Sequence, residues 1–392
     1  MIIASVLLAG CGVAELPMST FSNDGFESQQ IQKLFWPIFW MGMAVFVVVN
    51  GILLISIVRY RRRPEDGIPV QLHGNTRVEL AWTIAPAILV LGIAVMTFRT
   101  QAVIGREPVN PLQVTVIGHQ WWWEFEYAEY GIVTANELHL PVNRDVLFTL
   151  RSADVVHAFA FPRLYGVTDV IPGHENKILL RPQVVTEELI RGHCREFCGG
   201  THAQMAMHVA VRSEADFNSW IQQQQAAAPV PAGVQQSGGN QAASPAETPV
   251  AVGATVTATV IGEDATGDEV AATTAATVVA TAEAETTSTA VAQATSPQAK
   301  GYQLFASKGC IGCHAIQGYP GAASRVGPDL THVGSRGYIV AGWLPNTPEN
   351  MRRWLRDPNA VKPDNVMGTV IKLGTLKPDE IEALTAYLES LK

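Results

Sequence analysis

The chain has 392 residues, of which 35 are acidic and 27 basic, and its formal net charge is −8 at pH 7. This acidic balance lacks the basic surface that nucleic-acid binding requires, so no nucleic-acid partner is expected. The length exceeds that of one typical domain, and 47% hydrophobic residues with a mean hydropathy of +0.14 are more than most soluble proteins contain. We therefore expect several domains, including a membrane segment.

The chain begins with a short apolar leader, residues 1–11. Its end, Leu7-Leu8-Ala9-Gly10-Cys11, resembles a bacterial lipobox, in which the cysteine is acylated and the preceding segment is removed. No Lys or Arg precedes the apolar stretch, which is unusual for such a leader. We predict lipidation at Cys11, and an unmodified cysteine in an apolar leader is the alternative.

Residues 30–100 contain two long apolar runs that predict a transmembrane hairpin. Residues 35–58 have no charged side chain, and residues 78–98 carry one, Glu79, at the edge. Each run is long enough to cross the roughly 30 Å hydrocarbon core of a bilayer. Residues 59–63 of the connecting loop include four arginines, which places this loop in the cytoplasm. Everything after the hairpin is therefore expected on the exoplasmic side of a bacterial cell membrane.

Residues 101–225 have the pattern of an all-β domain. Short β-rich runs separated by turns occupy residues 112–117, 146–150, 178–180 and 205–211. A β-sandwich of such strands would be a rigid scaffold for functional side chains on its loops.

The residues with the clearest chemistry lie near the end of this domain. They follow the spacing C-x-E-x-C-x3-H-x2-M, with one histidine upstream: Cys194, Glu196, Cys198, His202, Met205 and His157. Two thiolates, two imidazoles and a thioether favour copper or zinc over magnesium or calcium. Two thiolates this close can bridge two metal ions and leave one histidine for each, which predicts a dinuclear copper centre for electron transfer. A structural zinc site and a disulfide are the alternatives, but zinc would not need Met205 and a disulfide would not need two histidines.

The composition changes over residues 226–299. Ala, Thr, Val, Pro and Gly dominate, and no Lys, Arg or aromatic residue occurs between Ala226 and Gln298. A segment of this composition cannot bury a core, so we expect a disordered linker. A flexible chain of about 74 residues spans roughly 45–50 Å and would let a tethered domain sample docking positions.

Residues 300–392 carry a haem-attachment motif. Cys310-Ile311-Gly312-Cys313-His314 has the C-x-x-C-H spacing, in which two thioethers hold haem c and the histidine ligates its iron. A chance match or a thioredoxin-like redox pair is the alternative. The following segment resembles a small all-α class I cytochrome c, including Gly327-Pro328-Asp329-Leu330 in the place of the loop that supports the proximal histidine.

The second axial ligand of this haem is predicted to be Met367. The run Lys362-Pro363-Asp364-Asn365-Val366-Met367 resembles the loop that brings in the distal methionine of such cytochromes. Met351 and His332 are the rival ligands. Apolar residues at helical spacing after Pro378 predict a final helix with a core-facing side.

Several motifs, in the same order along the chain, resemble subunit II of the haem–copper cytochrome c oxidases. They cover most of residues 30–225 and comprise His73-Gly74-Asn75 with Glu79, Gly118-His119-Gln120-Trp121-Trp122-Trp123, Asp154-Val155-Val156-His157, Thr168–Gly173 and the copper motif. The resemblance implies a cupredoxin sandwich that holds the copper centre CuA. It implies that His157 and Met205 bind one copper, that His202 and the backbone carbonyl of Glu196 bind the other, and that the two cysteines bridge them.

The resemblance also implies roles for three further groups. Trp121 would receive electrons from cytochrome c, and the carboxylate of Glu196 would help to bind magnesium at the boundary with subunit I. Glu79 would lie at the cytoplasmic mouth of a proton path into subunit I. A carboxylate at a membrane boundary that is simply solvated is the alternative for Glu79.

Together these features predict subunit II of a bacterial, caa3-type, proton-pumping cytochrome c oxidase. Electrons would pass from the fused haem c through Trp121 to CuA and then to the oxygen-reducing centre in subunit I. Subunit III and a donor, either a cytochrome c or a bc-type complex, are further expected partners. Net charges of −4 over residues 99–225 (10 basic, 14 acidic) and +3 over residues 300–392 (11 basic, 8 acidic) favour docking of the two domains.

Two other functions stay open at this point. The chain could serve a different terminal reductase that uses CuA, such as one for nitric or nitrous oxide. It could also be a copper-binding structural subunit, although the complete ligand set and the C-x-x-C-H motif argue against that role.

Overall fold

The computed structural model describes residues 16–61, 67, 71, 74–232, 234 and 296–392. The leader with Cys11, the loop arginines Arg62 and Arg63, His73 and nearly all of the predicted linker lie outside the described residues. The described residues comprise the membrane hairpin, the β domain and the C-terminal helical domain.

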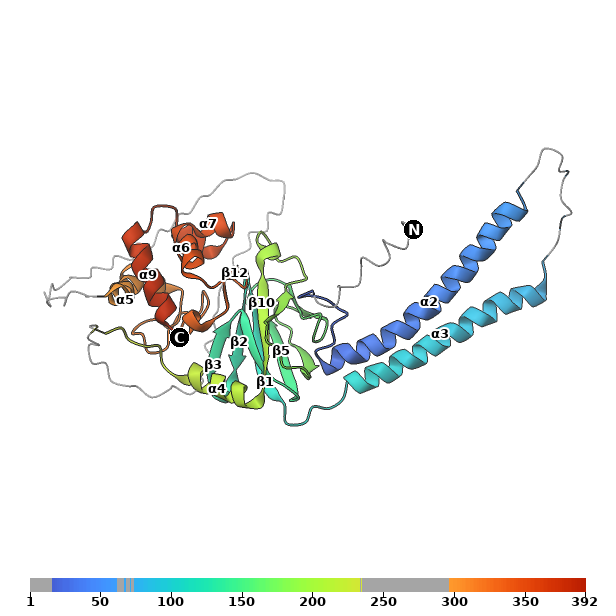
Figure 1. The fold of residues 1–392 in the computed structure, drawn as a ribbon, viewed down its shortest axis with the longest axis horizontal. Helices are drawn as coiled ribbons and strands as arrows, with labels where there is room; N and C mark the ends of the chain where they lie inside the picture. The colour runs from blue at the N-terminus through green and yellow to red at the C-terminus, as the bar shows by residue number, and fades with distance from the viewer. Residues whose placement is uncertain (1–15, 62–66, 68–70, 72–73, 233, 235–295) are drawn as a thin grey trace, which may run out of the picture. The chain divides into compact units, whose positions relative to one another are not determined.

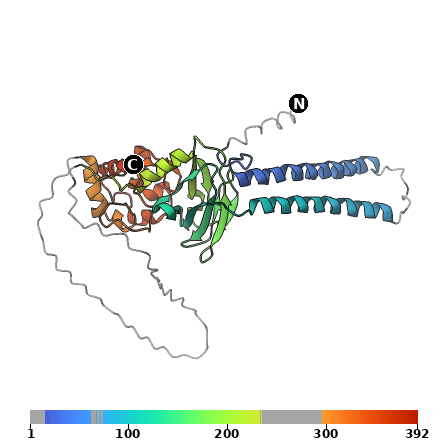
Figure 2. The same cartoon turned by 90° about the horizontal axis from the view of Figure 1, so that it is seen from below.

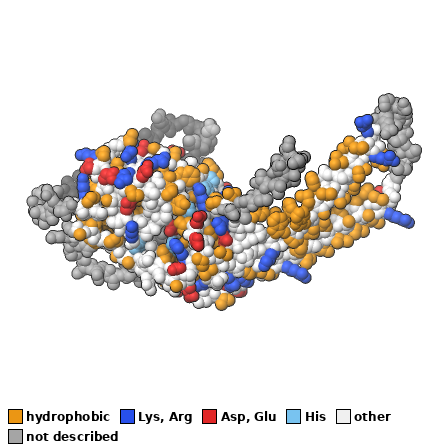
Figure 3. All heavy atoms as spheres, in the orientation of Figure 1, with side chains coloured by type: hydrophobic (Ala, Val, Ile, Leu, Met, Phe, Trp, Pro, Cys, Tyr) orange, Lys and Arg blue, Asp and Glu red, His pale blue; other side chains and the backbone are white. Residues whose placement is uncertain are grey.

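Two long helices, α2 (Phe26–Arg59) and α3 (Thr76–Ile104), run side by side (Figures 1 and 2). Asn75 caps α3 by accepting hydrogen bonds from the backbone N–H groups of Arg77 and Val78. Both helices are apolar and long enough to cross a membrane, and no residue of α3 is buried within the chain. Figure 3 shows hydrophobic side chains along their length, as expected for surfaces that contact lipid.

Both helices extend beyond the apolar runs that predicted them. With 34 residues and a rise of about 1.5 Å per residue, α2 is roughly 51 Å long, more than the hydrocarbon core of about 30 Å. The additional turns at its start carry polar side chains, among them Glu27 and Ser28, which are buried. Helix formation there depends on packing rather than on apolar composition, which explains why the sequence pattern placed the start of the helix too late.

The β domain contains two main sheets. One has the order β3-β2-β1-β5-β8 and the other β4-β10-β9, and β6 pairs with β7. The strands are β1 (Leu112–His119), β2 (Trp122–Tyr127), β3 (Ile132–Ala135), β4 (Glu137–Pro141), β5 (Val146–Ser152), β6 (His157–Ala160), β7 (Val167–Val170), β8 (Asn176–Leu180), β9 (Ile190–His193) and β10 (Ala206–Arg212). Two 3-10 turns, η2 (Ala128–Tyr130) and η3 (His202–Gln204), and helix α4 (Glu214–Gln225) complete the domain. The predicted β-sandwich is confirmed.

Alternating burial along the strands builds the core of this sandwich. In β1, Leu112, Val114 and Val116 are buried while the residues between them are more exposed. Large aromatic side chains such as Phe148 and Phe159 fill the space between the sheets. This core fixes the strand ends from which the functional loops emerge.

The C-terminal domain is helical, as predicted. It contains α5 (Pro297–Ser307), α6 (Pro348–Arg356), α7 (Pro358–Val361), α8 (Val366–Val370) and α9 (Pro378–Ser390), the turns η4 (Cys310–Gly312) and η5 (Val333–Ser335), and a short pair of strands, β11 (Tyr338–Ile339) and β12 (Leu344–Pro345). The final helix begins at Pro378 and buries Ile381, Leu384 and Leu388, so the predicted core face is confirmed. Helices α5 and α9 cross at Gly301, where an added Cβ would lie 2.0 Å from the carbonyl oxygen of Ala383.

Candidate metal centre and haem cavity

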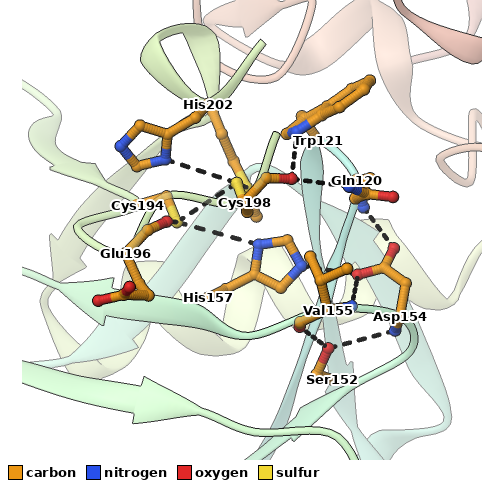
Figure 4. A network of polar contacts seen from close by, with 11 residues as sticks. Gln120, Trp121, Ser152, Asp154, Val155, His157, Cys194, Glu196, Cys198 and His202 are labelled. Carbon is orange, nitrogen blue, oxygen red and sulfur yellow. Dashed lines mark hydrogen bonds and ion pairs between the residues drawn. The ribbon is translucent and has the colours of Figure 1, made fainter. Parts of the chain in front are cut away.

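The predicted copper ligands come together at one end of the β domain (Figure 4). Five of them lie on the loop 194–205, which connects the antiparallel strands β9 and β10. The backbone N–H of Cys194 donates to the carbonyl of Met205 at 3.0 Å and closes the base of this loop. His157 is the first residue of β6 and reaches the loop from the neighbouring strand pair. A rigid scaffold therefore holds both segments.

The donor atoms form a compact cluster. The Sγ atoms of Cys194 and Cys198 are 3.9 Å apart, and Nδ1 of His157 lies 3.9 Å from Cys194 Sγ. On the other side, Nδ1 of His202 and Sδ of Met205 lie 3.5 and 3.8 Å from Cys198 Sγ. One imidazole nitrogen therefore faces each thiol, as a centre with two bridging thiolates requires.

The backbone carbonyl of Glu196 also points into the cluster, 3.2 Å from Cys194 Sγ. Its side chain is exposed and lies outside the donor cluster (Figure 4). The two parts of Glu196 thus face different surroundings, and only the carbonyl belongs to the sulfur cluster.

The electrostatics of the two thiols favour a bound cation. The hydrogen bond from the Cys198 thiol lowers the pKa of Cys194 to about 3, and His157 adds to this effect. The interaction with Cys194 and the burial of the site then raise the pKa of Cys198. A second thiolate beside the first is therefore unfavourable unless positive charge lies between them, and copper ions would supply that charge. The donor set and its geometry fit a copper centre.

A second layer of hydrogen bonds orients His157. Burial alone would lower its pKa, but the hydrogen bonds with Asp154 and Cys194 raise it. Asp154 Oδ1 lies 2.8 Å from His157 Nε2, which leaves Nδ1 directed at the sulfur atoms. Gly118 leaves room for the ring, because a Cβ there would lie 2.9 Å from His157 Cδ2.

Trp121 is hydrogen-bonded directly to Cys198, a predicted copper ligand. Its indole Nε1 donates to the carbonyl oxygen of Cys198 at 2.9 Å, and Nε2 of Gln120 donates to the same oxygen at 2.7 Å. The backbone N–H of Gln120 donates to Asp154 Oδ2 at 2.6 Å (Figure 4). The turn between β1 and β2 is therefore hydrogen-bonded to Cys198 and, through Asp154, connected to His157.

The haem-attachment residues line one large cavity in the helical domain. Cys310, Cys313, His314 and Met367 all contribute to its wall, and its empty volume is about 1440 Å³ including the space at its mouth. Apolar side chains from α5, α6 and α9 form much of the remaining wall. A largely apolar cavity beside Cys310, Cys313 and His314 is suited to a tetrapyrrole.

His314 is oriented for ligation within this cavity. Its Nδ1 lies 2.8 Å from the carbonyl oxygen of Pro328, so Nε2 is the nitrogen that remains for a ligand. A Cβ on Gly327 would lie 2.7 Å from the His314 ring, so this loop packs against the imidazole. The predicted supporting role of residues 327–330 is therefore consistent with the geometry, and these residues fit a covalently held haem.

The three candidates for the second axial ligand occupy different surroundings. Met367 and Met351 both line the cavity, but Met351 is buried in the domain core at 3% exposure, whereas Met367 is only partly buried. His332 does not line the cavity, and its Nε2 lies 3.2 and 3.1 Å from the carbonyl oxygens of Gln224 and Ala226. The geometry thus leaves Met367 the freer of the two thioethers.

The wall of the haem cavity includes residues of the β domain. Gln120, Trp121, Trp122 and Asn136 line it together with the C-terminal residues. Trp121 therefore contacts the haem cavity on one side and the carbonyl of Cys198 on the other.

The environments of three further residues could not be predicted from the sequence. Arg336 lines the cavity, is partly buried, and has no partner for its Nε among the described residues, which suits an anionic group such as a haem carboxylate. His208 is buried, its ring centroid lies 3.7 Å from that of Tyr338, and burial lowers its pKa to about 4. Lys362 is also buried. No local pattern signals these positions, because each acquires its role from a distant segment.

Glu79 has a local structural role. Its Oε1 accepts a hydrogen bond from the backbone N–H of Asn75 at 3.1 Å, at the start of α3. The carboxylate therefore helps to cap the helix N-terminus.

Comparison with known proteins gives consistent matches along the chain. Residues 24–100 match the transmembrane domain of cytochrome c oxidase subunit II, residues 131–212 match its periplasmic domain, and residues 298–392 match cytochrome c. Cytochrome c oxidase subunit 2 of Bacillus sp. (strain PS3) is 31% identical over 402 residues, covering 99% of this chain and 95% of that protein. The same subunit of Alkalihalophilus pseudofirmus is 29% identical over 396 residues, covering 99% of this chain and 94% of that protein. Among solved structures, the periplasmic domain of oxidase subunit II of Bradyrhizobium japonicum is 28% identical, covers 30% of this chain and 96% of that domain, and gives a TM-score of 0.29.

Proposed function

This chain belongs to the cytochrome c oxidase subunit 2 family, as a membrane-anchored subunit II of a haem–copper oxidase with a fused cytochrome c domain, and from that premise we propose how its residues carry electrons. Cys194 and Cys198 would hold two copper ions through their thiolates. His157, Met205, His202 and the backbone carbonyl of Glu196 would be the further ligands.

The observation that carries this proposal is the position of Trp121. Its side chain lines the haem cavity, and its indole N–H donates to the carbonyl of the copper ligand Cys198 at 2.9 Å. A continuous path of bonded and hydrogen-bonded atoms therefore runs from the haem cavity to the copper cluster. Haem c and a dinuclear copper centre would each supply a one-electron redox couple when bound.

The protein residues limit structural change during this transfer. The loop 194–205 is closed at its base, and His157 is fixed by Asp154. Rigid ligands keep one geometry in both oxidation states, which favours fast electron transfer. His314, held by the Pro328 carbonyl, and Met367 would ligate the haem iron, and Cys310 and Cys313 would hold the haem covalently.

The remaining expectations belong to the same proposal. The copper and haem domains lie on the exoplasmic side, the exposed carboxylate of Glu196 takes part in a magnesium site facing subunit I, and Glu79 lies near a proton path. Cys11 carries the lipid. Subunit I receives the electrons for oxygen reduction coupled to proton translocation, subunit III joins the complex, and a cytochrome c or bc-type complex is the external donor.

Metal analysis and electron paramagnetic resonance of the purified complex test the copper centre. Because one unpaired electron is shared by two equivalent copper nuclei, the hyperfine pattern should have more than the four lines of a single copper. Cys198→Ser should abolish this signal, and Met205→Leu should retain it with a shifted potential, because axial ligands tune copper sites. A four-line spectrum, or zinc in place of copper, would contradict the proposal.

A further inference from the structure

Lys362 is an unusual residue of the C-terminal domain because its charge is buried. The side chain is 4% exposed, although it carries an ammonium group. Other lysines of the domain behave differently, since Lys300 and Lys308 pair with carboxylates and Lys372 is exposed. Among the described residues, the hydrogen bonds of the Lys362 ammonium go to main-chain carbonyl oxygens.

Both of these carbonyls belong to the copper domain. Nζ of Lys362 donates to Trp121 O at 2.6 Å and lies 3.4 Å from Gln204 O. Trp121 links the haem cavity to Cys198, and Gln204 directly precedes the copper ligand Met205. In return, Nε2 of Gln204 donates to the carbonyl of Val361 at 3.3 Å. One ammonium therefore joins both segments that surround the copper centre.

On the haem side, Lys362 is fixed relative to Met367. The side-chain amide of Asn365 donates to the carbonyl of Lys362, and its Oδ1 accepts the backbone N–H of Gly368 at 2.7 Å. Asn365 thereby caps α8, the short helix that carries Met367. Any displacement of Lys362 along the copper domain would move the proposed haem ligand with it.

The two ligand loops also pack closely beside Lys362. A Cβ placed on Gly200, within the copper loop, would lie 2.8 Å from the carboxylate of Asp364 in the haem loop. Glycine at position 200 thus permits a contact that a larger residue would prevent. The contact leaves little room for an alternative register of the two loops.

We propose that Lys362 is a positioning residue for electron transfer, which fixes the register in which the Met367 loop meets Trp121 and the copper loop. This inference rests on the proposed transfer from haem to copper. It concerns the geometry of that transfer and assigns no new redox step.

Lys362 is better suited to setting geometry than to adding affinity. A buried ammonium without a carboxylate partner is costly, and burial lowers the pKa of Lys362 to about 7. Other contacts can keep the two domains together, including the ion pair of Arg325 with Glu126 at 2.5 Å and the hydrogen bond from Gly337 N to Glu137 Oε2 at 2.8 Å. Removing the Lys362 donors should therefore loosen the register while the domains stay attached.

The test is Lys362→Met in the full chain, assembled in the complete oxidase. Haem c is photoreduced and the reduction of the copper centre is followed by its optical absorption. The rate should fall, because electron tunnelling slows as the distance between the two centres increases and as the contact through Trp121 loosens. The optical and magnetic spectra of both centres should be unchanged. Lys362→Arg, which retains donors and charge, should restore part of the rate, and Lys372→Met is the matched control on the exposed lysine.

The possible outcomes distinguish a failure of the proposed electron transfer from a failure of the positioning role of Lys362. If the wild-type complex shows no transfer from haem to copper, the proposed function fails. If the wild type transfers electrons and Lys362→Met does so at the same rate, the positioning role is refuted. If Lys362→Met does not load haem, acylation of lysine side chains in the wild-type complex is the alternative test. Protection of Lys362 relative to the exposed Lys372 supports the proposal, and equal reactivity of the two lysines overturns it.

Discussion

Replacing Asp154 with alanine should weaken copper binding without removing any ligand. In the structure, Asp154 Oδ1 lies 2.8 Å from His157 Nε2, and Oδ2 accepts the backbone N–H of Gln120 at 2.6 Å. The His157 ring is fully buried, and Asp154 is the hydrogen-bond partner of its Nε2. The substitution therefore frees the ring that presents Nδ1 to the copper centre.

The magnitude follows from this single contact. A hydrogen bond to a charged group contributes about 1.5–3 kcal/mol, which corresponds to roughly 10- to 150-fold in a binding constant. Loss of a group that orients a metal-bound histidine typically lowers metal affinity by about 10- to 100-fold, a comparable range. We expect an effect near the lower end, because Asp154 is itself 30% exposed and solvent screens its charge.

Competition with a chromophoric copper chelator measures this effect, and electron paramagnetic resonance reports whether the remaining centre keeps its symmetry. Glu175→Ala is the matched control, because Glu175 is a carboxylate of the same domain that pairs with Arg151 at the surface. Copper affinity and spectrum of Asp154→Ala that equal those of the control would refute the role assigned to this hydrogen bond.

Three further outcomes are expected. Met367→Ala should remove the methionine-to-iron charge-transfer band and lower the haem potential, whereas Met351→Ala should mainly destabilise the domain. Optical spectra and redox titration measure these effects. The reverse pattern would identify Met351 as the axial ligand. Trp121→Phe keeps an aromatic ring but loses the hydrogen bond to Cys198 O. Electron transfer from photoreduced haem c to the copper centre should therefore slow, while the spectra of both centres stay unchanged. The ring of Trp122 stacks on His119, and Trp122→Phe should have a smaller effect. After the chain is cut within residues 235–295, the haem domain should be retained on the copper domain more strongly as the pH rises from about 7 toward 10.5. The reason is that Lys362 has a pKa of about 7 in the docked state, so the docked state holds fewer protons than the separated state. The affinity should rise by at most about tenfold per pH unit, and Lys362→Met should abolish this rise. A wild-type profile that is flat or falls with pH would contradict the assigned environment of this lysine.

The copper and haem ligands could be predicted from the sequence because most of them lie close together along the chain. The loop 194–205 contains five of the predicted copper ligands in one motif, and C-x-x-C-H contains three haem contacts. Such spacing is sufficient because one loop or turn brings these side chains together. The β-rich run at residues 112–117 and the apolar side of α9 could likewise be predicted, since both depend on a local sequence pattern.

The contacts between distant segments could not be predicted in this way. Lys362 and Trp121 are 241 residues apart, and the pairing of their atoms depends on how two separately folded domains meet. His208 looks like any polar residue in a strand, and its stacking on Tyr338 joins two segments that are far apart in the chain. Composition indicated the charge difference between the domains but not which residues form the interface.

The central claim is that electrons pass from haem c to the copper centre within one chain, through Trp121. The most direct measurement is photoreduction of haem c in the intact complex over a dilution series. The copper centre should be reduced as the haem is reoxidised, with a rate constant that is independent of complex concentration and that decreases in Trp121→Phe. A rate proportional to concentration, or haem reoxidation without reduction of the copper centre, would contradict the account.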